Sequence, residues 1–227
     1  MIQVRGLTKR FGGVAAVDDC SLDIQPGKIT SVIGPNGAGK TTLFNLICGI
    51  SRPDKGTIML SGKDITSRAT HMVARAGISR TFQQARLFKN LSVKDNLLLA
   101  KETSEKELKR ALDAVFFPLP MSTKAGELSY GQSRLLEIAR AILKPHSILM
   151  LDEPTAGVNP KVRQELKKIL LSLKKEGSTI LLIEHDMEFV MSISDEIIVM
   201  AQGKVLTRGS PLQIQKDKRV LEVYLGK

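Results

Sequence analysis

The sequence predicts an α/β fold in which helices cover both faces of a mainly parallel sheet. Two apolar runs, Ile148–Leu151 and Thr179–Ile183, have the length and composition of strands that are buried on both faces of such a sheet. Amphipathic helical segments alternate with these runs along the chain, and this alternation is typical of the fold class. The 227 residues are 42% hydrophobic and 25% charged, which excludes a disordered or fibrous protein.

The N-terminal part begins with short strands and continues into a strand–loop–helix unit. Apolar residues alternate with polar ones, as in half-buried strands, at Ile2, Val4, Leu7, Leu22 and Ile24. The run Ile29–Ile33 predicts a buried strand, and a glycine-rich loop after it leads into a helix that starts at about Lys40 and ends by Gly49. Residues 56–65 predict two short strands around Gly62.

The middle of the chain has a different character from the rest. The charged stretch Lys101–Arg110 has a helical pattern and is followed by prolines, so we expect a small helical subdomain at about residues 92–128. After it, Ser133–Leu143 predicts an amphipathic helix. Asn159 and Pro160 predict the start of another helix, which Gly177 ends. A final hairpin is expected around Gly203.

Composition limits the class of protein and its partners. No apolar run approaches the roughly 20 residues of a membrane-spanning helix, and the N-terminus lacks the apolar core of a signal peptide. We expect Cys20 and Cys48 to be reduced and buried. The net charge of +11 favours an anionic partner such as a nucleotide, a nucleic acid or a membrane surface, although a merely lysine-rich surface fits it equally well. With 4% aromatic residues and no tryptophan, the chain is poor in material for stacking nucleic-acid bases.

The strongest motif is a phosphate-binding loop between the strand Ile29–Ile33 and the helix after it. It runs through Gly34, Pro35, Asn36, Gly37, Ala38, Gly39, Lys40, Thr41 and Thr42. Its glycines let backbone N–H groups turn toward phosphate oxygens, and the helix N-terminus adds partial positive charge. Lys40 would reach the outer phosphates and the Thr41 hydroxyl would bind Mg²⁺. The alternative is a glycine-rich turn before an ordinary helix.

Two acids follow the strand Ile148–Leu151. Asp152 and Glu153 would lie at the carboxyl edge of the parallel sheet, where open α/β folds bind their ligands. Asp152 would hold Mg²⁺, directly or through water, and Glu153 would orient the attacking water or take its proton. The alternative is a helix-capping acid beside a solvated neighbour.

The segment Leu128-Ser129-Tyr130-Gly131-Gln132 resembles the LSGGQ signature of ATP-binding-cassette (ABC) ATPases. It stands between the phosphate loop and the acidic strand, in the order of that family, and the resemblance covers essentially the whole chain. It implies that Ser129, Gly131 and Gln132 help to bind the nucleotide. Tyr130 replaces the usual middle glycine but leaves Ser129 and Gly131 in place. A plain serine-capped helix start is the alternative.

Further residues match the family's motifs one by one. Gln83 resembles the Q-loop glutamine, which senses Mg²⁺ and water, and the neighbouring Gln84 leaves a shift of one residue open. His185 resembles the switch histidine that contacts the γ-phosphate. Phe11 stands where the family places an aromatic that stacks on adenine, with a core phenylalanine as the alternative. Asn159 ends the segment that matches the D-loop, where aspartate is usual.

The resemblance implies one ABC ATPase domain over residues 1–227. Residues 1–83 and 129–227 would form a phosphate-loop NTPase core with an antiparallel β subdomain, and residues 84–128 would form the helical subdomain. Two copies, identical or different, would pair head to tail around ATP and Mg²⁺. Transmembrane permease subunits would complete the transporter.

Several motifs together resemble the ATPases of branched-chain amino acid importers. The matching segments are Arg80–Gln83, Leu128–Gln132, Ala156–Pro160 and Val220–Gly226. We therefore expect an ATP-hydrolysing subunit at the cytoplasmic face of the membrane, with a periplasmic or extracellular substrate-binding protein as a further partner. Urea or amide import and lipopolysaccharide export remain alternatives for the cargo. An ABC ATPase that acts on nucleic acid or ribosomes, or a non-catalytic nucleotide-binding regulator, fits less well, and no nucleic-acid partner is expected.

Overall fold

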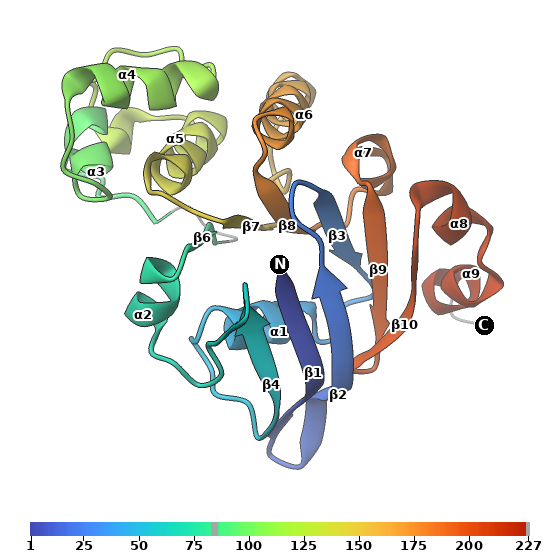
Figure 1. Cartoon of the computed structure of the whole chain (residues 1–227). Coiled ribbons are helices and arrows are strands. Elements are labelled where there is room, and N and C mark those ends of the chain that lie inside the picture. The colour runs from blue at the N-terminus through green and yellow to red at the C-terminus, as the bar shows by residue number, and fades with distance from the viewer. Residues whose placement is uncertain (83–85, 226–227) are drawn as a thin grey trace.

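The computed structural model describes residues 1–82 and 86–225, and the strands of these residues form two sheets (Figure 1). The smaller sheet has the order β2-β1-β4-β5. Its strands are β1 (Ile2–Phe11), β2 (Val14–Ile24), β4 (Lys55–Leu60) and β5 (Lys63–Asp64). Every pairing in it is antiparallel, so the expected antiparallel β subdomain is confirmed.

The larger sheet has the order β10-β9-β3-β8-β7-β6. Its strands are β3 (Ile29–Ile33), β6 (Ile78–Arg80), β7 (Ile148–Asp152), β8 (Thr179–Ile183), β9 (Glu196–Ala201) and β10 (Lys204–Gly209). The strands from β9 to β6 are parallel, and β10 joins the edge antiparallel. Every residue of β3, β7 and β8 is buried, as the apolar runs predicted. The α/β fold class is therefore confirmed.

The helices cover both faces of the larger sheet. They are α1 (Lys40–Ile47), α2 (Thr70–Arg75), α3 (Val93–Leu98), α4 (Glu105–Ala114), α5 (Tyr130–Leu143), α6 (Pro160–Lys175), α7 (Met187–Ile193), α8 (Pro211–Lys216) and α9 (Lys218–Leu225). The apolar side of α1 packs in one core with residues of both sheets. Helices α3 to α6 contribute to a second core on the other face of the larger sheet.

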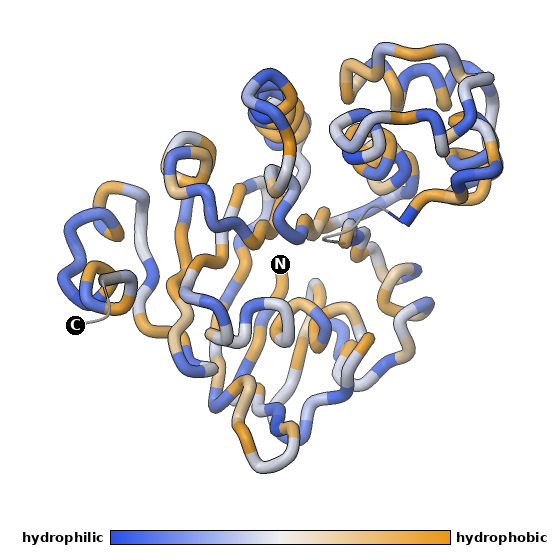
Figure 2. Tube along the Cα trace, turned by 180° about the vertical axis from the view of Figure 1, so that it is seen from behind, coloured by the Kyte–Doolittle hydropathy of each residue, from blue (hydrophilic) through white to orange (hydrophobic). Residues whose placement is uncertain are grey.

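Alternate residues of strand β7 pack into the two cores on opposite faces of the larger sheet. Ile148 and Met150 belong to the core beneath α1, whereas Leu149 and Leu151 belong to the core beneath α5 and α6. This alternation follows from the two-residue period of a strand. Figure 2 shows hydrophobic residues along the central strands, and mixed hydrophilic and hydrophobic residues along the outer helices. The acids that end β7 are thus carried by a strand held from both faces.

Two helix starts differ from the sequence-based prediction. The helix expected at Lys101–Arg110 is α4, which begins at Glu105 because the Ser104 side chain caps it by accepting from the Glu107 N–H. The helix expected at Ser133 begins at Tyr130, since Ser129 caps it. The structure also contains β6, α2, α3, α7, α8 and α9, which are not among the elements expected from the sequence.

Helices α3, α4 and α5 lie together at one end of the molecule (Figure 1). Since α5 packs with α3 and α4 although it follows residue 128, the boundaries of the helical subdomain at residues 84 and 128 stay a prediction. Among the residues that the structure describes, no helix combines the length and apolarity needed to cross a membrane.

Candidate active site

The loop between β3 and α1 depends on glycine at two positions. At Gly34, where φ is +147°, an added Cβ would lie 2.1 Å from the Met200 carbonyl oxygen. At Gly39, where φ is +96°, it would lie 2.1 Å from the Ala16 carbonyl oxygen. Both contacts are far inside van der Waals distance, so the tight approach of the loop to β2 and β9 requires residues without side chains.

Within residues 1–82 and 86–225, no side chain caps the N-terminus of α1. Gly39 occupies the cap position and no acid stands in the first turn, so the first N–H groups of the helix point toward the loop without a side-chain partner. Lys40 is 6% exposed, and its Nζ donates to the carbonyl oxygens of Gly34 (2.8 Å) and Pro35 (3.0 Å). Burial lowers the pKa of Lys40, while the nearby carboxylates of Glu153 and Asp152 oppose that shift. The arrangement is a cationic anion-binding loop.

Asp152 ends β7 in a buried ion pair. Its Oδ2 accepts from Arg80 Nη2 at 2.8 Å, and the two side chains are 5% and 6% exposed. Arg80, at the end of the neighbouring strand β6, also donates from Nη1 to Asn45 Oδ1 of α1 at 2.8 Å. Burial raises the pKa of Asp152, and Arg80 acts against this by favouring the carboxylate. Arg80 thus ties the end of β7 to α1.

Glu153 and His185 meet across the edges of β7 and β8. His185 Nε2 lies 2.9 Å from Glu153 Oε1. The Glu153 backbone has a φ of +49°, and its N–H donates to the Ile183 carbonyl, which turns the chain at the strand end. The buried Glu184 accepts from Thr155 N–H and Oγ1 and from His185 N–H. These bonds fix the segments after β7 and β8, which carry the Glu153–His185 pair.

A cleft brings most of the phosphate loop together with Glu153 and His185, whereas Gly34, Pro35 and Asp152 do not line it. It is lined by Ala16, Asn36, Gly37, Ala38, Gly39, Lys40, Thr41, Thr42, Glu153 and His185. The phosphate loop, the acid after β7 and the histidine after β8 therefore face one space, as expected for the carboxyl edge of this sheet. The oxygen donors of Thr41 and Asp152 suit Mg²⁺, which binds one or two protein oxygens and completes its shell with water and phosphate. Among the residues that the structure describes, no group of three or more His, Cys, Asp or Glu is placed to hold a metal ion.

The signature segment forms the N-terminus of α5. Ser129 Oγ accepts from the Gln132 N–H at 3.3 Å, and Gln132 Oε1 accepts from the Ser129 N–H at 2.8 Å. This capping box is the serine-capped helix start that the sequence left open, and it is compatible with a further role of Ser129. A Cβ on Gly131 would lie 2.9 Å from Val162 Cγ2 of α6, so Gly131 also lets α5 and α6 approach closely. None of these residues lines the cleft of the same chain.

The remaining predicted residues lie elsewhere. Phe11 ends β1, is 52% exposed and does not line the cleft, so the alternative of a core phenylalanine is wrong. The Nζ atom of Lys9 lies 5.4 Å from the centre of the Phe11 ring. Gln83 and Gln84 lie outside the described residues. Asn159 caps α6, where its Oδ1 accepts from the Val162 N–H.

Arg80 is a further site residue, which no sequence motif had indicated as one. Its partner Asp152 stands 72 positions later, and only the pairing of β6 with β7 joins them. The available signal was that Arg80 opens the segment Arg80–Gln83, which matches the importer ATPases. The two cysteines are free and buried, as predicted.

Comparisons with known proteins give the same family as the motifs. A family model described as ABC transporter matches residues 17–156. The chain is 43% identical to the high-affinity branched-chain amino acid transport ATP-binding protein BraF of Pseudomonas aeruginosa, over all of this chain and 98% of that protein. It is 41% identical to LivG of Escherichia coli, which carries the same description, with the same coverage. The lipopolysaccharide export system ATP-binding protein LptB of Acidithiobacillus ferridurans is 34% identical over all of this chain and 97% of its own length.

A solved structure adds the fold. The ADP conformation of MJ1267, an ATP-binding cassette of an ABC transporter, has a TM-score of 0.90 and 32% identity, and the match covers all of this chain and 99% of that one. Together with the phosphate loop, the acid pair after β7 and the signature segment, these matches show that the chain belongs to the ABC transporter family, as one of its ATP-binding, ATP-hydrolysing cassettes.

Proposed function

We propose that this chain is the ATPase subunit of a membrane transporter that imports branched-chain amino acids. The observation that carries the proposal is the cleft where Lys40, Glu153 and His185 face one another. Full-length similarity to BraF and LivG supports the cargo class. The lower identity to LptB makes lipopolysaccharide export the second candidate.

In the proposed mechanism the loop binds the phosphates of ATP. The N–H groups at the start of α1 and the ammonium of Lys40 would donate hydrogen bonds to the β- and γ-phosphate oxygens. Thr41 and Asp152 would hold Mg²⁺, which neutralises charge on the phosphates. The remaining loop residues would contribute backbone contacts, Phe11 would stack on adenine after a rearrangement, and Gln83 would sense the metal and water.

Glu153 and His185 would act on the water. Glu153 would orient it and take its proton as its oxygen attacks the γ-phosphorus and ADP leaves. With its proton on Nε2, His185 donates to Glu153 Oε1 and so holds the carboxylate toward the cleft. Turning toward the γ-phosphate, the same N–H would stabilise the charge there.

The signature of one chain would complete the site of another. Ser129, Gly131 and Gln132 stand at the N-terminus of α5, outside the cleft of their own chain. A head-to-tail pair would bring each signature to the partner's γ-phosphate and create two composite sites. Closure would exclude water and align the nucleophile, so hydrolysis would be gated by dimerisation.

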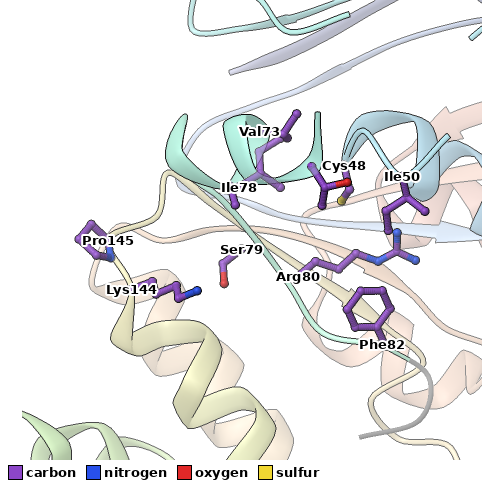
Figure 3. Close-up of a pocket in the computed structure, with 11 residues that line it drawn as sticks. Cys48, Ile50, Val73, Ile78, Ser79, Arg80, Phe82, Lys144 and Pro145 are labelled. Carbon is purple, nitrogen blue, oxygen red and sulfur yellow. The ribbon is translucent and has the colours of Figure 1, made fainter. Parts of the chain in front are cut away.

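A groove between α1, α2, β6 and the end of α5 is the proposed contact with the permease. It is lined by Cys48, Ile50, Thr70, Val73, Ala74, Ile78, Ser79, Arg80, Phe82, Lys144 and Pro145 (Figure 3). Arg80, Phe82 and Lys144 also line a second hollow that reaches Arg86, so apolar and basic residues border one continuous surface. Because Arg80 also forms an ion pair with Asp152, a displacement of Arg80 at the groove would be transmitted to the end of β7. On this proposal the subunit is peripheral, at the cytoplasmic face of the membrane.

Charge reversal tests the permease contact. In the assembled transporter, Arg86→Glu or Lys89→Glu should reduce transport while basal ATP hydrolysis by the isolated subunit stays near wild type. Lys175→Glu, on the exposed end of α6, is the matched control and should change neither. Equal losses of both activities, or no loss at all, would contradict this assignment of the contact surface.

Cargo is tested by reconstitution. Co-expression with a permease pair and a substrate-binding protein, copurification, and assembly into proteoliposomes should give ATP hydrolysis that leucine, isoleucine or valine stimulates and lipopolysaccharide does not. Stimulation by lipopolysaccharide alone would replace the import proposal by the export alternative.

A further inference from the structure

The signature residue Tyr130 joins two other segments of the proposed mechanism. It occupies the first turn of α5, directly after Ser129, and 47% of the residue is exposed. It stands where the ABC signature usually has glycine, so its side chain is a feature of this chain that the common motif lacks. Its hydroxyl contacts Arg134, whose guanidinium carbon also lies 5.6 Å from the centre of the ring, and its ring lies near Gly157.

The hydroxyl contact leads to Phe82, the residue directly before Gln83. Tyr130 Oη accepts from Arg134 Nη2 at 3.1 Å. Arg134 is fully buried, and its Nη1 donates to the Phe82 carbonyl at 2.6 Å and to Glu137 Oε2 at 2.8 Å. Glu137 Oε1 in turn accepts from the Phe82 N–H at 3.1 Å. Both backbone polar groups of Phe82 are therefore held by side chains of α5, one of which is bonded to Tyr130.

The ring contact leads to the segment that follows Glu153. A Cβ added to Gly157 would lie 3.4 Å from Tyr130 Cε1, which is ordinary van der Waals contact. Gly157 has a φ of +70° and belongs to the turn in which the Ala156 N–H donates to the Glu153 carbonyl. The tyrosine ring thus lies beside the turn that carries the proposed catalytic carboxylate.

We propose that Tyr130 is a positioning residue that locks Ser129, Phe82 and Gly157 into one unit, so that the signature reaches the partner's nucleotide only when the segments before Gln83 and after Glu153 are correctly placed. This inference rests on the proposed head-to-tail dimer and deepens it. A buried guanidinium holds its partners in fixed directions, because its hydrogen bonds diverge in one plane. A flexible surface residue at position 130 would give no such constraint.

Tyr130→Phe removes the hydroxyl and keeps the ring. It is measured in a Glu153→Gln parent, which should bind ATP and dimerise without rapid turnover. We expect the ATP concentration for half-maximal dimerisation to rise roughly tenfold, the effect of one hydrogen bond to a charged group. Binding of a fluorescent ATP analogue to the monomer should change less than about twofold, because Tyr130 does not line that cleft.

Tyr130→Gly restores the family's usual residue and removes the ring as well. It should shift dimerisation further than Tyr130→Phe, because the packing on Gly157 is lost in addition. Thr103→Val is the matched control, since it removes a hydroxyl that donates to Glu107 at the start of α4, away from the signature. It should leave the dimerisation curve unchanged.

The parent protein separates the possible failures. If Glu153→Gln alone does not dimerise at any ATP concentration, the head-to-tail proposal fails and the inference falls with it. If the parent dimerises and Tyr130→Phe does so at the same ATP concentration, the positioning role of Tyr130 is wrong. Parallel losses of monomer binding, thermal midpoint and dimerisation would mark a merely structural residue and would also overturn it. In the protein with Glu153 intact, a changed kcat with an unchanged monomer affinity supports the proposal.

Discussion

The N-termini of α1 and α5 would both face phosphate in the proposed dimer, yet the chain treats them differently. Helix α1 has Gly39 at its cap position and no side-chain cap from the described part of the chain, whereas α5 is capped by Ser129 with a complete capping box. The free N–H groups of α1 suit a phosphate bound by the same chain. At α5, the hydroxyl proposed to meet the partner's phosphate already accepts the Gln132 N–H. A serine hydroxyl can accept that bond and donate its own proton, so the cap and the phosphate contact can coexist.

The largest expected effect concerns the nucleotide cleft at the N-terminus of α1, which Glu153 also lines. Glu153→Gln should lower the rate of ATP hydrolysis by about 10²–10⁴-fold, since the group that takes the proton from water is lost. Because the phosphate loop is untouched, the ATP-bound dimer should accumulate, which size-exclusion chromatography with Mg-ATP would detect. Glu102 is an exposed acid that does not line the cleft, so the Glu102→Gln variant serves as the control and should hydrolyse ATP at the wild-type rate. Turnover at the wild-type rate would remove Glu153 from the catalytic role.

Mixing two inactive variants tests whether α5 serves the other chain. Lys40→Ala damages the loop, and Ser129→Arg places a bulky cation at the signature. Each variant alone should be inactive. In an equal mixture, half of the dimers are mixed and each has one intact site, so turnover should return to about a quarter of wild type if the sites act independently. If both sites must close together, ATP-dependent dimerisation should still recover. Loss of both signals in a mixture that contains mixed dimers would contradict the head-to-tail arrangement.

A substitution at Gly39 tests whether the close approach of the α1 N-terminus to β2 requires a residue without a side chain. Gly39→Ala should lower the free energy of unfolding by about 2–4 kcal/mol, because the new Cβ meets the Ala16 carbonyl oxygen and φ is positive. Gly37→Ala is the matched control, since φ is +80° there but no atom lies within 4 Å of the added Cβ. It should lower that free energy by about 1–2 kcal/mol. Urea unfolding measures both, and equal values would show that the close approach to β2 is unimportant.

The α1 side could be predicted from the sequence more completely than the α5 side. The loop from Gly34 to Lys40 and the acids after β7 are local patterns, in which neighbouring residues determine both the backbone and the chemistry. The capping box of α5 is also local, and a serine cap at Ser129 is one of the sequence-based alternatives, but the apolar period of the helix shows only from Ser133 onward. The pair of Tyr130 with Arg134 is local too, since the two stand four residues apart on α5, whereas the approach of Tyr130 to Gly157 and of Arg134 to Phe82 depends on how α5 packs against the rest of the fold.

Long-range pairs and very short elements account for the other differences. Arg80 finds Asp152 only because β6 pairs with β7. Helices α2 and α3 have six residues each, so they are too short for an apolar period to show. The cleft itself was predictable, since strand ends of a parallel sheet meet at one edge. The ion pair that positions Asp152 was not.

The smallest expected effect separates the cap at α5 from its proposed contact with the partner. Ser129→Ala removes the cap and should lower the free energy of unfolding by about 1 kcal/mol. Helix α8 offers a matched control, because Ser210 and Gln213 form the same capping box there. The two backbone-to-side-chain distances are 2.8 and 3.4 Å at α8, against 2.8 and 3.3 Å at α5. Ser210→Ala should therefore cost about the same stability. In the Glu153→Gln background, only Ser129→Ala should raise the ATP concentration needed for dimerisation, because only Ser129 would also donate to the partner's phosphate. If both variants shift dimerisation equally, the serine of α5 acts as a helix cap alone and the two N-termini differ in stability but not in function.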